Sequence, residues 1–236
     1  MTFNAKKFMK YTKEELEILL QQDKPGQTSH LKMAPEHRQN DIAMFDPKNA
    51  RKSAVMIVLF NDADDLKVVL IRRGKYVGIH SGQIAFPGGR YEDTDKNVRN
   101  TAIREIEEEI GIKANDYSIL GRLTDIFVPP SNFVVSIFVA YMHQKPKFKI
   151  DPREVDEVLV FSLDDFVREG AIGQREFFVA SANTSTIAPC YLLDGAELWG
   201  ASAMVMTELL DLLKTDKHTI SNNKFEKDEI YKKQIV

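Results

Sequence analysis

The sequence lacks the features that mark disulfide-rich, membrane-spanning and nucleic-acid-binding proteins. A single cysteine, Cys190, occurs among 236 residues, which excludes an intramolecular disulfide and a cysteine-cluster metal site. No apolar run is as long as a transmembrane helix, and residues 1–10 lack the apolar stretch of a signal peptide. The net charge is −3, whereas a dedicated nucleic-acid-binding domain is usually strongly basic. We therefore expect a soluble, cytoplasmic protein without nucleic-acid or membrane partners.

The hydrophobic content is sufficient for one buried core, since 43% of the residues are hydrophobic. Helix-like and strand-like segments alternate along the chain, which predicts a mixed α+β fold. We expect an N-terminal helix with an extended arm, one main domain and a charged C-terminal tail, and we place these parts at residues 1–50, 51–213 and 214–236.

The strand predictions start from a continuous apolar run between Ala54 and Phe60, which is rich in β-branched residues and short for a helix. A turn and a second strand at 66–72 complete a hairpin. Further strands are predicted at 83–86, 117–126, 134–143 and 158–161. Helices are predicted at 12–22, 97–110, 163–169 and 201–213, and residues 23–50 are predicted to be irregular. Thr12 and Glu15 have the spacing of a capping box at the first helix.

The helix predicted at 97–110 carries three glutamates on one face. At about 100° per residue, Glu105, Glu108 and Glu109 fall within roughly 100° of arc. The neighbouring face is apolar and holds Ile103, Ile106 and Ile110. Carboxylates spaced this closely repel one another, and a hard divalent cation bound between them removes the repulsion.

An alternative interpretation is an ordinary acidic face exposed to solvent. The preceding pair Gly88–Gly89 favours the metal site instead, because glycine lets the backbone come close to a ligand. We interpret the glycine loop and the helix together as a platform for a metal ion and a diphosphate.

This segment resembles the Nudix box. Residues 104–112 match its second half, Arg-Glu-x-x-Glu-Glu-x-Gly-apolar. In the first half, five residues lead from Gly89 to Asp95, which stands in place of the usual glutamate, and eight residues then precede Arg104. That is one residue more than in the usual box.

A box lengthened at this place is similar to that of the coenzyme A pyrophosphatase subgroup. Flanking segments at 31–35, 80–90 and 198–203 also resemble that subgroup, so the resemblance spans residues 30–213. It implies the Nudix fold, in which a mixed β-sheet is sandwiched between helices (α/β/α).

The resemblance also implies a set of metal ligands. Mg²⁺ or Mn²⁺ would be held by Glu105, Glu108, Glu109 and the carbonyl oxygen of Gly88, and Arg104 would orient the acids.

The general base is open between Glu105 and an acid just before the strand predicted at 158–161, either Glu154 or Glu157. We assign the catalytic roles to Glu105, Arg104 and Glu157.

Substrate binding is assigned to four residues near the glycine loop: Arg73, His80, Gly89 and Arg90. The two arginines can hold phosphates, and the histidine can contact a phosphate or position the loop. Solvated surface or a structural role is the alternative for each of these side chains. Trp199 is expected to pack, whereas Phe127 and Phe133 are further candidates for an adenine site.

The function implied by the resemblance is hydrolysis of the diphosphate of coenzyme A or its derivatives, giving 4'-phosphopantetheine and adenosine 3',5'-bisphosphate. One alternative is a Nudix pyrophosphatase for ADP-ribose, dinucleotides or nucleoside triphosphates. Another is a Nudix module that binds nucleotides without catalysis. The partner would be a small CoA-like nucleotide, and the N-terminal arm and C-terminal helix could also form a homodimer interface.

Overall fold

A computed structural model describes residues 10–35, 49–74, 80–179 and 183–214. The tail predicted at 214–236 lies outside the described residues except for Lys214, and parts of the predicted arm and of the loop before residue 80 also lie outside them. No helix in the described ranges is long and apolar enough to cross a membrane.

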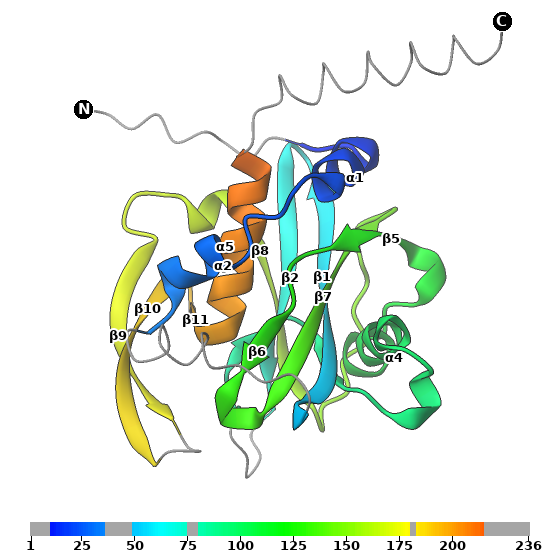
Figure 1. Cartoon of the computed structure of the whole chain (residues 1–236). Coiled ribbons are helices and arrows are strands. Elements are labelled where there is room, and N and C mark those ends of the chain that lie inside the picture. The colour runs from blue at the N-terminus through cyan, green and yellow to red at the C-terminus, as the bar shows by residue number, and fades with distance from the viewer. Residues whose placement is uncertain (1–9, 36–48, 75–79, 180–182, 215–236) are drawn as a thin grey trace, which may run out of the picture.

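The centre of the fold is an eight-stranded sheet (Figure 1). Its strands are β1 (Arg51–Asp62), β2 (Asp65–Arg73), β3 (Ile84–Ala85), β4 (Gly88–Arg90), β5 (Tyr117–Arg122), β6 (Ile126–Val128), β7 (Phe133–Met142) and β8 (Val155–Ser162). β1 forms an antiparallel hairpin with β2 and runs parallel to β7. β8 pairs with β2, and β5 and β6 pair with β7. The parallel β1–β7 pair makes the sheet mixed, as predicted.

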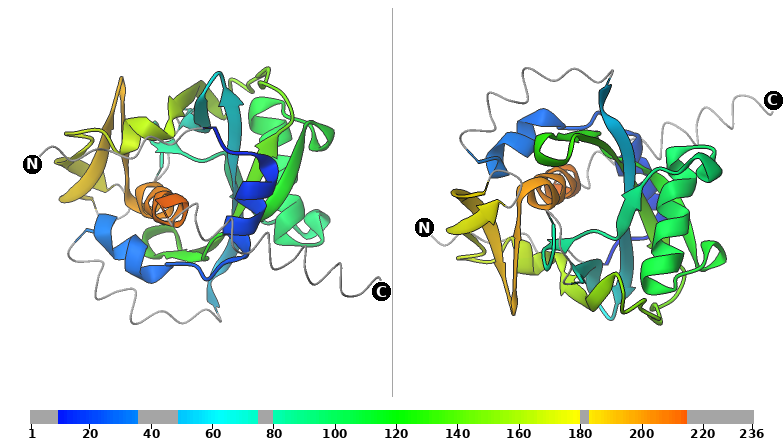
Figure 2. Two further views of the ribbon diagram at one scale, coloured as in Figure 1. Left: turned by 90° about the horizontal axis from the view of Figure 1, so that it is seen from above. Right: turned by 90° about the horizontal axis from the view of Figure 1, so that it is seen from below.

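Helices cover both faces of this sheet (Figure 2). They are α1 (Lys13–Gln21), α2 (Gln27–His30), α4 (Val98–Ile110) and α5 (Gly200–Lys214). Successive strand residues point to opposite faces, so Met56, Val58 and Phe60 of β1 join the core under α4. Ile57 and Leu59 join the core under α1 and α5. The expected α/β/α arrangement is confirmed.

The first helix begins where the capping box predicted it. Thr12 Oγ1 accepts a hydrogen bond from the Glu15 N–H at 3.1 Å, and the Glu15 carboxylate accepts one from the Thr12 N–H at 2.9 Å. Leu16, Leu19 and Leu20 are buried, so the predicted apolar stripe faces the core.

The N-terminal arm is more ordered than predicted, because α2 and a short 3-10 helix after it bind to α5. His30 Nε2 lies 2.8 Å from Glu208 Oε2, and Ser29 Oγ donates to Asp211 Oδ2 at 2.5 Å. Glu208 is fully buried and also accepts hydrogen bonds from the N–H and hydroxyl of Thr124. We call these five residues the α5 clasp, since they join the arm, α5 and the β5–β6 connection.

A second, three-stranded sheet was not predicted from the sequence. It consists of β9 (Ile172–Val179), β10 (Thr184–Leu193) and β11 (Ala196–Trp199), and it packs beside α5 (Figure 1). Polar residues occupy much of β9 and the start of β10. Pro189 interrupts the apolar second half of β10, and a proline within a run is a signal against a strand. The single strand predicted at 117–126 is also wrong, because the structure divides it into β5 and β6.

Candidate active site

α4 is fixed at both ends and along one side, and this sets where its glutamates point. The Asn97 side chain accepts a hydrogen bond from the Asn100 N–H at the first turn, and Gly111 ends the helix with φ 74°. Ala102, Ile106 and Ile110 are fully buried against the sheet. The predicted apolar face is therefore confirmed, although Ile103 is only partly buried at its margin.

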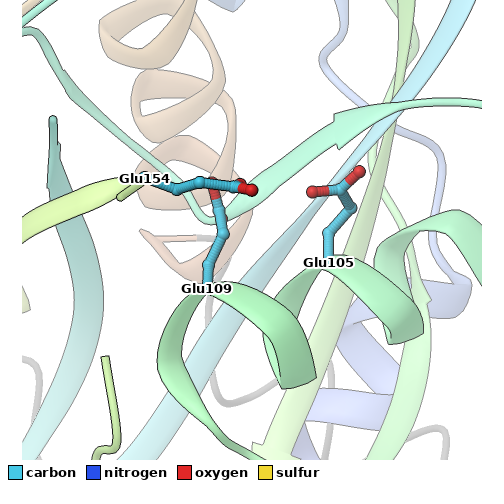
Figure 3. A group of neighbouring side chains, drawn as sticks. All are labelled: Glu105, Glu109 and Glu154. Carbon is cyan, nitrogen blue, oxygen red and sulfur yellow. The ribbon is translucent and has the colours of Figure 1, made fainter. Parts of the chain in front are cut away.

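Three carboxylates converge beside α4. Glu105 and Glu109 come from the helix and Glu154 from the turn before β8 (Figure 3). Their nearest oxygen atoms all lie within 4.8 Å of one another. Glu105 and Glu109 are buried, whereas Glu154 is exposed. We call this group the acid cluster.

Backbone hydrogen bonds bring Glu154 to the helix. The Asp151 N–H donates to the Glu109 carbonyl oxygen at 3.0 Å, which ties this segment to the end of α4. The Glu154 N–H then donates to the Asp151 carbonyl oxygen at 3.1 Å, and the Gly74 N–H donates to the Glu154 carbonyl oxygen at 2.7 Å. The third acid is therefore positioned by the fold, 45 residues after Glu109 in the chain.

The glycine loop closes the cluster from the other side. The Gly88 N–H donates to Glu109 Oε2 at 2.8 Å, and a Cβ atom at Gly88 would overlap the Ala54 carbonyl oxygen of β1. A Cβ atom at Gly89 would overlap the Glu105 carboxylate. Position 88 therefore requires glycine, whereas a side chain at position 89 would have to displace the Glu105 carboxylate.

Arg104 connects the cluster to a buried aspartate. Its Nε and Nη2 donate to the two oxygens of Asp95 at 2.8 and 3.1 Å, and its Nη1 lies 2.8 Å from both Glu105 Oε1 and Glu108 Oε2. The pKa of Asp95 is lowered to about 2, mainly by the hydrogen bond from Arg104, although burial acts in the opposite direction. Asp95, noted in the sequence only as a variant box residue, therefore orients the arginine that holds Glu105.

The acid cluster has the electrostatics of a cation site. Burial raises the pKa of Glu109 to about 8, although Arg73 and the Gly88 N–H oppose it, and Glu105 and Glu154 raise it further. Burial also raises the pKa of Glu105, against the opposing effect of Arg104. A divalent cation would favour the ionised form of these carboxylates.

Two predicted site residues lie outside the acid cluster. The Glu108 carboxylate pairs with Arg104 and its side chain is 54% exposed. Glu157 is 52% exposed and pairs with Arg72 at 3.2 Å. The sequence did not distinguish Glu154 from Glu157, because the turn that directs Glu154 inward depends on contacts with α4. The roles assigned to Glu108 and Glu157 stay predictions.

A pocket of about 420 Å³ lies next to the glycine loop. It is bounded by the sheet face of β1, β6 and β7, by the first turn of α5 and by the small sheet. All four predicted substrate-binding residues line it, together with the predicted ligand Gly88. Most of the remaining wall is apolar: Val55, Ile84, Phe86, Ile126, Val128, Val135, Ile137, Val179 and Val205.

The histidine and the aromatic residues occupy distinct places around this pocket. His80 Nδ1 lies 3.0 Å from Gln83 Oε1, and burial lowers the pKa of His80. Trp199 lines the pocket while stacking on Phe177, with ring centroids 4.2 Å apart. Phe133 also lines the pocket, whereas Phe127 is not among its lining residues. The tryptophan therefore both packs and contributes to the wall, which sequence periodicity did not indicate.

Comparison with known proteins identifies relatives of this chain. A family model described as NUDIX domain matches residues 50–180. A peroxisomal coenzyme A diphosphatase of Caenorhabditis elegans is 36% identical over 120 residues, which cover 50% of this chain and 51% of that protein. A mitochondrial coenzyme A diphosphatase of Homo sapiens is 28% identical over 144 residues, 61% of each chain. A mitochondrial Nudix hydrolase of Arabidopsis thaliana is 36% identical over 134 residues, 55% of this chain and 45% of that protein.

The chain spans about half the length of the Caenorhabditis elegans and Arabidopsis thaliana relatives, each of which is 36% identical to it. The family model covers more than half of the chain and includes the glycine loop, α4 and Glu154. The chain therefore belongs to the Nudix family.

Proposed function

We propose that the protein hydrolyses the diphosphate of coenzyme A or a coenzyme A derivative, giving 4'-phosphopantetheine and adenosine 3',5'-bisphosphate. The observation that carries this proposal is an acid cluster that adjoins, through Gly88 and Gly89, a largely apolar pocket with arginines in its wall. Two relatives are named coenzyme A diphosphatases, and the lengthened box supports the same substrate.

The acid cluster fits a hard divalent cation, either Mg²⁺ or Mn²⁺. Its members offer only carboxylate oxygens, the ligand type that such ions prefer, and two of them are buried side by side. We propose that Glu105, Glu109 and Glu154 hold the metal, with the Gly88 carbonyl oxygen and Glu108 as further ligands. The ion would polarise the diphosphate and lower the pKa of a bound water.

The other residues of the site position these groups. Asp95 and Arg104 restrict the Glu105 carboxylate, and the Gly88 N–H restricts that of Glu109. Arg73, whose Nη1 lies 3.8 Å from Glu109 Oε1, binds the diphosphate in this proposal, and Arg90 binds a phosphate group of the substrate. For the general base we favour Glu154 over Glu157, because Glu154 adjoins the buried acids.

The direct test is incubation of the purified protein with coenzyme A and Mg²⁺, followed by chromatography of the nucleotide products. We expect equal amounts of 4'-phosphopantetheine and adenosine 3',5'-bisphosphate, and loss of both products on chelation of the metal. A panel containing ADP-ribose, a dinucleotide and a nucleoside triphosphate gives the comparison by kcat/KM. Faster turnover of any of these than of coenzyme A would contradict the proposed substrate.

Location and assembly belong to the same proposal. We propose a cytoplasmic protein that acts on a small-molecule substrate, without nucleic-acid or membrane partners, and a homodimer. Relatives carry peroxisomal and mitochondrial names, so imaging of the tagged full-length protein is the test of location. Light scattering of the purified chain tests the dimer, and a monomeric mass would contradict it.

A further inference from the structure

One rim of the pocket is formed by an arginine and a phenylalanine in contact. Arg51 and Phe133 are paired residues of the parallel strands β1 and β7, and the Arg51 Cζ atom lies 4.1 Å from the centroid of the Phe133 ring. A hydrogen bond of 2.6 Å from Arg51 Nη2 to the Ser131 carbonyl oxygen holds the guanidinium in place. Phe133 lines the pocket and Arg51 does not, so the ring lies on the pocket side of this pair.

The distance from this pair to the glycine loop suits a nucleoside. Val55 of β1 pairs with Gly88 of β4, and Arg51 precedes Val55 by four residues. At roughly 3.3 Å per residue, the pair lies about 13 Å along β1 from the glycine loop. A diphosphate placed at the acid cluster would therefore leave a ribose and a base to extend along β1 toward Phe133.

Arg90 lies between these two points. It pairs with Ser53, the residue midway between Arg51 and Val55, and it lines the pocket. Its guanidinium makes no ion pair with a described residue. None of the described residues that line the pocket is acidic, so this part of the wall is suited to a negatively charged ligand.

We infer that Arg51, Phe133 and Arg90, which we call the nucleoside rim, bind the purine nucleoside end of the substrate. The adenine packs against the Phe133 ring, which also contacts the Arg51 guanidinium, and the 3'-phosphate faces Arg90. Aromatic rings and guanidinium groups both pack favourably on bases. This inference rests on the proposed function, since it gives the rim the half of coenzyme A that leaves as adenosine 3',5'-bisphosphate.

Binding of that product tests the rim without turnover. Trp199 is the only tryptophan of the chain and lines the same pocket, so its fluorescence reports occupancy, with calorimetry as a second measurement. We expect Phe133→Leu to weaken binding of adenosine 3',5'-bisphosphate about tenfold, and Phe133→Tyr to restore it. Unchanged binding by a folded Phe133→Leu variant would overturn the inference.

The matched control is Phe127→Leu. Phe127 lies on the neighbouring strand β6 and pairs with Val134, one residue out of step with the lining residues Ile126 and Val128. The same chemical change is therefore made on the other face of the sheet, and we expect less than about a twofold effect on binding. Equal losses from Phe127→Leu and Phe133→Leu would overturn the assignment to the pocket face.

Arg90→Gln tests the position of the 3'-phosphate. We expect this variant to weaken adenosine 3',5'-bisphosphate about tenfold and AMP, which lacks the 3'-phosphate, by less than about threefold. Equal weakening of the two ligands would overturn this part of the inference.

The rim and the proposed reaction can fail separately. If coenzyme A is not hydrolysed but Phe133→Leu still weakens the adenosine bisphosphate selectively, the reaction is wrong and the rim stands. If coenzyme A is hydrolysed and Phe133→Leu instead weakens 4'-phosphopantetheine, the rim binds the other half of the substrate and the inference is overturned.

Discussion

Two walls meet at the glycine loop, and different forces hold them in place. The acidic wall consists of α4, the loop and the turn before β8, and directed contacts such as Arg104 with Asp95 and Gly88 with Glu109 fix its side chains. The pocket wall consists of β6, β7, α5 and the small sheet, and it is mostly apolar. Burial holds this second wall, with the α5 clasp as its polar junction.

The two walls tolerate substitution differently. Hydrogen bonds require particular atoms at short distances. Replacing one carboxylate by its amide, as in a Glu→Gln or Asp→Asn variant, is therefore expected to disturb the acidic wall. Apolar packing tolerates exchanges of similar volume, so the pocket wall can change its ligand preference while it keeps its fold. We therefore assign the chemistry to the acidic wall and the choice of substrate to the pocket wall.

The largest expected effect separates two glutamates three residues apart. Glu154→Gln should lower kcat/KM by more than about 100-fold, which exceeds the usual loss for a residue that only supports a metal ligand. Glu157→Gln removes an exposed ion pair with Arg72, and such pairs contribute about 0–1 kcal/mol, so its kcat/KM should stay near wild type. Steady-state kinetics and Mn²⁺ titration measure both variants. Comparable losses from the two would show that proximity to the buried acids does not define the site.

A smaller effect is expected from the buried aspartate behind the arginine. Asp95→Asn removes the charge that orients Arg104 and should lower kcat/KM or metal affinity about 10- to 100-fold. Asp93→Asn in the same turn is the control, because Asp93 is exposed. The comparison of walls predicts that metal affinity falls more than the affinity for adenosine 3',5'-bisphosphate, and the opposite order would contradict it.

The α5 clasp should affect stability more than chemistry. His30→Ala leaves the buried Glu208 carboxylate without one of its partners, which should reduce the free energy of unfolding by about 1–3 kcal/mol. Lys32→Ala breaks only an exposed pair with Asp211 and should cost less than about 1 kcal/mol. Urea unfolding measures both, and kcat at saturating substrate should change little. A large loss of kcat with unchanged stability would place the clasp in the chemistry instead.

The smallest expected effect is the number of protons that Glu109 releases when a metal ion binds. Burial raises the pKa of Glu109 to about 8, above its value in an unfolded chain. Its contribution to stability is therefore fully present below the unfolded pKa and is lost as the pH rises through about 8. A metal ion requires the ionised carboxylate, so binding at pH 7 should release about one proton from this group.

Calorimetry in two buffers of different ionisation enthalpy measures this release. We expect the difference between the buffers to shrink at pH 9, where Glu109 is mostly ionised. Glu109→Gln is the control, because it has no proton to release at this position. Release that is unchanged at pH 9 would show that another group supplies the proton.

Local patterns predicted α1, α4, α5 and most strands of the main sheet. The apolar run of β1 and the capping box of α1 each act within a few residues, so they can be read without knowledge of the fold. The small sheet was not predicted, because polar residues occupy much of β9 and Pro189 lies within the apolar part of β10, while its strands pair with one another. The α5 clasp was also missed, since His30 and Glu208 are 178 residues apart.

At the acid cluster, sequence alone determined that α4 presents Glu105 and Glu109 beside an isoleucine face and that glycines precede the helix. Helical periodicity and the absence of a Cβ atom are local properties, which is why they could be predicted. Only the tertiary structure brought Glu154 rather than Glu157 to the acid cluster and placed Phe133 and Trp199 in one pocket. Those choices depend on how distant strands and turns pack together, and packing follows from the whole chain.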